Sequence, residues 1–149
     1  MNPMQNIILA CIIIGFALIE IASKSYKGYE ATKDDSKLEL FMFLSLLGVL
    51  QPLIFFITSK LGTMWFPEMK GSLAAWPAWV MFAVLLVGDD LTQYWWHRIS
   101  HSPLLWPLHR AHHSAHYMSI RMTYRNNFFY YAMMPGLWIA GSAIYLGFA

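Results

Sequence analysis

Four long apolar segments constrain what this chain can fold into more than any other feature of its sequence. They run from Met4 to Ala22, Leu38 to Thr58, Leu73 to Val87 and Phe128 to Phe148. A bilayer core of about 30 Å needs roughly 20 helical residues, so these segments predict membrane spans, of which the third is short and must be extended by the residues that follow it. The chain has 149 residues, of which 58% are hydrophobic and 12% charged, and a globule of that size cannot bury so much apolar surface. We therefore expect an all-α integral membrane protein, a single membrane domain over residues 1–149 with about four transmembrane helices.

The ends of these segments refine the prediction. The first segment lacks a basic region before it and a small-x-small cleavage site after it, which favours a retained helix over a signal peptide. Pro52 lies inside the second segment and predicts a kink of the kind that membrane helices tolerate. The third segment ends in "GDD", but nothing before Ser100 breaks a helix. We expect this helix to carry "DDLTQYWWHRISH" out of the membrane, with Trp95 and Trp96 at the depth of the lipid headgroups.

Charge placement predicts the orientation. The loop after the first segment holds Lys24, Lys27, Lys33 and Lys37, and the loop after the third holds Arg98, Arg110, Arg121 and Arg125. The intervening loop holds only Lys60 and Lys70. The positive-inside rule then places the two richer loops on the cytoplasmic side of a multi-pass protein. The net charge is only +2, without a basic run that could follow a phosphate backbone, so nucleic acid is not an expected partner.

All six histidines of the chain lie between His97 and His116. His97 and His101 are four residues apart, so on a helix they share one face and could bind one metal ion. Asp90 and Tyr94 lie on the same face, where Asp90 could ligate a metal or accept a hydrogen bond from a ligand's second ring nitrogen. His97 and His101 are therefore predicted to be two ligands of a metal site.

A second histidine group follows the segment "SPLLWP". Pro107 suits the first turn of a new helix. That helix would present a stripe of histidines spaced by three, one and three residues, namely His109, His112, His113 and His116. A single histidine near a membrane is more often an interfacial residue than a ligand, but six within twenty residues favour a metal site. The only cysteine is Cys11 and no glutamate follows Glu68, so the ligands would be nearly all imidazole. Imidazole suits iron, zinc, copper and nickel, and ligand type alone does not choose among them.

The segment "DDLTQYWWHRISHSPLLWPLHRAHHS" resembles the fatty acid hydroxylase and sterol desaturase superfamily of integral-membrane oxygenases. Members carry histidine boxes of the form H-x3-H and H-x2-H-H, followed by a further box. His97 and His101 match the first box, and the second box is matched by His109, His112 and His113. The surroundings of the boxes, among them Asp90, Tyr94, Trp106 and Ser114, are also similar. The likeness covers about Asp89 to Arg125.

This resemblance implies a cluster of transmembrane helices capped by a cytosolic di-iron centre. It also implies a reaction in which dioxygen and two electrons hydroxylate or desaturate a C–H bond of a membrane lipid, such as a sterol, fatty acid or ether lipid. The electrons would come from a separate donor, such as a cytochrome b5-like protein, a ferredoxin or a reductase. The expected metal ligands are His97, His101, His109, His112 and His113, with His116 and Asp90 as further candidates and Tyr94 as a hydrogen-bonding group at the metals.

One departure from the family pattern leaves alternatives open. No histidine follows His116, so the third box is missing. The chain is then expected to be truncated at its C-terminus relative to the family, to be a naturally short relative, or to receive ligands from a second copy in a homo-oligomer. Two rival functions are a non-catalytic membrane metal binder, with zinc as the alternative metal, and an inactive fragment of such an oxygenase. A transporter would place polar ligands at mid-membrane, whereas Glu20, Glu39 and Asp89 lie near helix ends.

Overall fold

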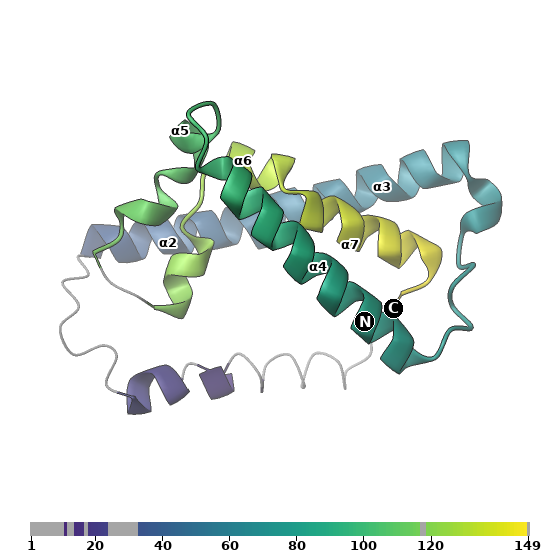
Figure 1. Ribbon diagram of the computed structural model, residues 1–149, viewed down its shortest axis with the longest axis horizontal. Helices are drawn as coiled ribbons and strands as arrows, with labels where there is room; N and C mark the ends of the chain where they lie inside the picture. Colours follow the sequence, from purple (N-terminus) through teal and green to yellow (C-terminus); the bar gives the residue numbers. More distant parts are fainter. Residues whose placement is uncertain (1–10, 12–13, 17, 24–32, 117–118, 149) are drawn as a thin grey trace.

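The computed structural model describes residue 11 and residues 14–16, 18–23, 33–116 and 119–148. Every regular element in these ranges is helical (Figure 1), which confirms the all-α class. The helices of the main body are α2 (Lys33–Ser45), the π turn η1 (Leu46–Leu50), α3 (Gln51–Trp65), η2 (Pro67–Met69), α4 (Ala78–Ser100), α5 (Trp106–His109), η3 (His112–Ser114), η4 (Ile120–Tyr124), α6 (Phe128–Met133) and α7 (Pro135–Leu146). About half of the predicted first span, Met4 to Ala22, lies outside the described residues.

The second predicted span is part of a longer helix. The elements α2, η1 and α3 continue into one another from Lys33 to Trp65, a 33-residue helix that is long and apolar enough to cross a membrane. Proline has no N–H, and its ring collides with the carbonyl four residues earlier, so Pro52 would break a regular helix. Directly before Pro52 the backbone N–H of Gln51 donates to the carbonyl of Leu46, five residues back. This π turn is the local adjustment that lets the helix pass the proline.

The third predicted segment is confirmed as a helix that continues past its apolar part. It begins at Ala78 rather than Leu73 because Pro77 precedes it, and it runs unbroken to Ser100. The side chains of Trp79 and Phe82, in the apolar half, are about 73% and 67% exposed, as suits contact with lipid. The polar half carries the first histidines beyond that surface.

The fourth predicted span is wrong as a single helix. Residues 128–148 form α6 and α7, which are separated by Met134 in an extended conformation. The cause is Pro135, because the ring of a proline disfavours helical geometry at the residue before it. The twelve residues of α7 rise only about 18 Å, less than a bilayer core. Within the described ranges only Lys33–Trp65 qualifies as a span, so about four transmembrane helices are not confirmed.

Close helix packing joins α7 to α3, and α7 also contacts α4. Gly141 and Gly62 make the first contact close: a Cβ on Gly141 would lie 2.5 Å from Thr58 Oγ1, and one on Gly62 would lie 2.7 Å from the Tyr145 ring. Tyr145 donates its hydroxyl to the carbonyl of Phe66, which ties the end of α7 to the end of α3. The absence of side chains at two helix positions therefore sets the distance between these helices.

Adding a methyl group at Gly141 is expected to destabilise the protein. Gly141→Ala places a Cβ against Thr58 and Phe55, both held by a packed helix, and overpacking of this kind costs about 1–3 kcal/mol. The measurement is thermal unfolding in detergent. Gly88→Ala on α4 is the matched control, because its Cβ would meet nothing within 4 Å. An unchanged melting temperature for Gly141→Ala would mean that α3 and α7 are not packed as closely as described.

A largely buried ion pair joins the start of α2 to the segment before α6. Arg125 Nη1 lies 2.6 Å from Asp35 Oδ1, and the two side chains are 9% and 22% exposed. Asp35 is in the first turn of α2, and Arg125 precedes α6. The start of α2 and the segment before α6, both in basic regions of the sequence, are thus held together. Their position on the cytoplasmic side stays a prediction.

Candidate metal centre

The last turn of α4 presents the first histidine pair. His97 lies in that turn and His101 is the residue that caps its C-terminus. Their Nε2 atoms are 3.1 Å apart. The helical spacing of four residues places both rings on one side, as the sequence predicts. Two ring nitrogens this close cannot both carry a proton directed at the other, so the pair offers at least one free lone pair.

A tight turn after α4 brings in the second pair. The N–H groups of Leu105 and Trp106 both donate to the carbonyl of Ser102, at 3.1 and 2.9 Å. Pro107 occupies the first turn of the short helix α5, as predicted. This helix ends at His109, which is fully buried. The chain reversal therefore points His109 back at the end of α4.

The predicted single helix carrying all four later histidines is wrong beyond α5. The chain tightens into the 3-10 turn η3, and Ala115 is extended, with φ −74° and ψ 134°. Ser114 supports this ending, since its hydroxyl donates to the carbonyl of Ala111. His113 still reaches His109, with 3.0 Å between the Nε2 atoms. His116 lies past the extended residue, is exposed, and is not among the grouped histidines.

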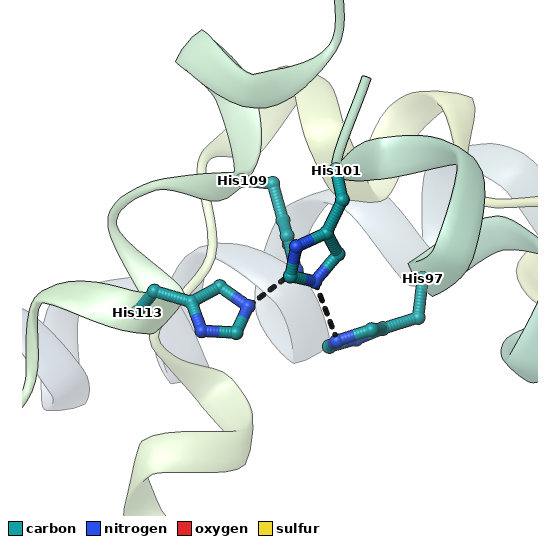
Figure 2. Close-up of side chains that lie close together, drawn as sticks. All are labelled: His97, His101, His109 and His113. Carbon is teal, nitrogen blue, oxygen red and sulfur yellow. Dashed lines mark hydrogen bonds between the residues drawn. The ribbon is translucent and has the colours of Figure 1, made fainter. Parts of the chain in front are cut away.

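Four histidines converge on one point (Figure 2). Each offers one ring nitrogen, and the four nitrogens lie within 4.8 Å of one another: His97, His101, His109 and His113. Two nitrogens bound at right angles to one ion, with bonds of about 2.1 Å, would lie about 3.0 Å apart. The separations within the pairs His97–His101 and His109–His113, 3.1 and 3.0 Å, agree with that value. The four donors could therefore hold one transition-metal ion if the rings close around it, while a second ion needs donors beyond these four.

Burial favours the uncharged form of these rings. Burial first, and then the neighbouring rings of His97, His112 and His113, lower the pKa of His109 from 6.5 to about 4. Burial is also the largest cause of the lowered pKa of His97 and of His113. At neutral pH these imidazoles are unprotonated, which is the state that ligates a metal.

His109 is the most constrained ring of the cluster. It stacks on Tyr130 with ring centroids 4.9 Å apart, and His112 stacks on it at 5.2 Å. Its Nδ1 lies 3.3 Å from Oδ1 of Asn126, which is itself buried. Sequence reasoning missed Asn126, because it is 17 residues from His109 and no spacing rule connects the two.

The other predicted site residues lie around the cluster rather than in it. The ring of His112 is 5.7 Å from that of His97, and burial lowers the pKa of His112. Asp90 is exposed and does not belong to the group of converging nitrogens. Tyr94 accepts a hydrogen bond from Arg98 Nη1 at 2.7 Å. A hollow of about 360 Å³ is lined by Tyr94, His97, Arg98 and His101.

Comparison with known families agrees with the resemblance carried by the histidine boxes. Residues 82–149 match the family model described as fatty acid hydroxylase. The matched range takes in all six histidines, together with Asn126 and Tyr130. No solved structure matches the chain.

Proposed function

We propose, from the fatty acid hydroxylase domain that residues 82–149 form, that this chain is a membrane lipid oxidoreductase with an imidazole-bound iron centre. The observation that carries the proposal is the convergence of four ring nitrogens within 4.8 Å inside the matched range. The substrates are a membrane lipid, either a sterol, a fatty acid or an ether lipid, and dioxygen. Electrons come from a separate protein donor.

The four converging histidines would hold the iron. Bound there, iron would supply the redox chemistry that activates dioxygen and attacks an unactivated C–H bond, which zinc cannot supply. His112 lies beside the four and is the next candidate donor, for a second ion completed by ligands from elsewhere. The lowered pKa values of His97 and His109 keep their rings able to bind at neutral pH.

Access to the centre runs along α4. The apolar half of this helix is exposed at Trp79, Phe82 and Val87, and the hollow beside Tyr94 and Arg98 opens at His97 and His101. A lipid lying against the apolar half would reach the hollow by extending along the same helix. Tyr94 and Arg98 hold each other in place at that point, and their polar groups suit the wet side of a membrane interface.

The experiment that tests this proposal measures metal and turnover on the same sample. Protein purified in detergent from iron-sufficient medium is expected to contain at least one iron per chain by elemental analysis. Reconstituted in phosphatidylcholine nanodiscs with NADPH, a ferredoxin and its reductase, it should consume dioxygen faster when a sterol, a fatty acid or an ether lipid is added to the discs, with the oxidised form of the added lipid detected by mass spectrometry. Iron binding without lipid-dependent oxygen consumption would contradict the assigned activity.

A second candidate function is a non-catalytic zinc-binding membrane protein. The observation that favours it is the donor count, because four imidazoles complete a structural zinc site without open positions. Elemental analysis separates the two candidates: zinc alone, bound in iron-sufficient medium and resistant to exchange with Fe²⁺, would favour the second.

A further inference from the structure

We propose that Asn126 is a positioning residue, which fixes the ring of His109 so that its Nε2 faces the other three donors. The Asp35–Arg125 ion pair in turn holds Asn126 in place from the first turn of α2. This inference rests on the metal centre of the proposed function and assigns to it two groups outside the histidine boxes.

The orientation of the Asn126 amide decides which nitrogen of His109 carries the proton. Asn126 Nδ2 lies 3.5 Å from the carbonyl of Thr123, which can only accept a hydrogen bond. The amide oxygen is thereby turned toward His109 Nδ1, at 3.3 Å. An amide oxygen is also only an acceptor, so Nδ1 must be the protonated nitrogen. The lone pair of His109 is then on Nε2, the atom that lies 3.0 Å from His113 Nε2.

Asn126 contacts the His109 ring at Nδ1, opposite the nitrogen that faces His113, and so helps to set the in-plane rotation of this ring. Tyr130 and His112 stack on His109 at interplanar angles of 18° and 20°. Stacking fixes the plane of an imidazole but not its rotation within that plane. A hydrogen bond to the nitrogen opposite the ligating one fixes that rotation, which is the usual arrangement around metal-bound histidines.

The ion pair anchors the residue next to Asn126. Arg125 is buried, and its Nη1 donates to Asp35 Oδ1 at 2.6 Å, across 90 residues of sequence. Its backbone N–H donates to the carbonyl of Met122. A buried guanidinium without a carboxylate would be strongly unfavourable, so the pair fixes the loop to the membrane helix. Because Asn126 is the next residue in the chain, the ion pair of Arg125 also restricts the position of the Asn126 backbone.

The test is a titration of the metal-free, detergent-purified full chain with Co²⁺, followed by the visible absorption of imidazole-bound cobalt. Asn126→Leu removes the acceptor at similar volume and is expected to weaken Co²⁺ binding about 10–100-fold. Asn126→Asp keeps an acceptor for Nδ1–H and is expected to bind Co²⁺ within about threefold of the wild type. The matched control is Asn127→Leu: Asn127 is the adjacent amide, and its side chain accepts a hydrogen bond from the Phe129 N–H at the start of α6. It should also stay within about threefold.

Each result decides the proposal. Equal affinity of Asn126→Leu and the wild type would overturn the positioning role while leaving the metal centre intact, and so would equal weakening by Asn126→Leu and Asn126→Asp. No Co²⁺ binding by the wild type would overturn the centre and the positioning role together. Should Asn126→Leu fail to fold, ¹⁵N NMR of metal-free wild-type protein labelled at its histidines tests the same proposal, because it reports which ring nitrogen of each histidine carries the proton. The signals of His109 are assigned as those missing from the spectrum of His109→Gln. They should show a proton on Nδ1, and a proton on Nε2 would overturn the proposal.

Discussion

Replacing His101 with alanine is expected to weaken iron binding about 100-fold or more and to abolish lipid oxidation. The Nε2 of His101 is one of four converging donors, and losing a direct ligand should cost more than the 10–100-fold typical of a supporting residue. The side chain is exposed, so its removal leaves no cavity and the melting temperature should hold. The measurements are Fe²⁺ affinity under anaerobic conditions and turnover in nanodiscs.

The control for this substitution is His116→Ala. His116 is also an exposed histidine of the same segment, but it lies outside the cluster. Its replacement should leave iron affinity and turnover within about twofold of the wild type. If His116→Ala and His101→Ala weakened iron binding equally, the ligand set described here would be wrong. His112→Ala adds a further distinction, since it should lower the iron content only if the chain binds a second ion.

Replacing Asp35 with alanine is expected to lower the free energy of unfolding by roughly 2–5 kcal/mol. The substitution leaves Arg125 buried without its carboxylate, and the side chain of Arg125 is only 9% exposed. The measurement is unfolding in mixed micelles of increasing denaturing detergent. Metal affinity should fall as well, because the loop that carries Asn126 loses its anchor.

The adjacent residue Asp34 provides the control for Asp35. Asp34 also lies in the first turn of α2 and also forms an ion pair, with Lys37 at 3.0 Å. The side chains of that pair are 87% and 77% exposed, however, and exposed pairs contribute little to stability. Asp34→Ala should therefore leave the unfolding midpoint nearly unchanged. A similar loss of stability for both variants would show that charge at the helix N-terminus, rather than burial of Arg125, is what matters.

Local periodicity is the part of this structure that the sequence predicts. The four-residue spacing of His97 and His101 gives their relation on α4, and Pro107 gives the start of α5, because both depend on neighbours within one turn. The continuation of α4 through its polar half is predicted for the same reason. The histidine boxes predict the family by resemblance, and residues 82–149 match the family model described as fatty acid hydroxylase.

The rest depends on contacts that local spacing does not encode. The break between α6 and α7 at Met134 follows from Pro135. A prediction from hydrophobicity alone does not find this break, because the apolar residues continue on both sides of it. The end of the helix before His116 depends on a turn that tightens only in the folded chain. Neither Asn126 nor the pairing of Asp35 with Arg125 has a sequence pattern, since the first contact spans 17 residues and the second spans 90.

The 90-residue separation of Asp35 and Arg125 also bears on the order in which contacts form as the chain folds. His97 and His109 are close in sequence and need only a short loop to meet, whereas Asp35 and Arg125 must close a long one. Closing so long a loop carries an entropic cost that is offset only when the last contacts form. The rings of His97 and His109 are therefore expected to meet early in folding, and the Asp35–Arg125 contact is expected to fix the loop that carries Asn126 only at a late step.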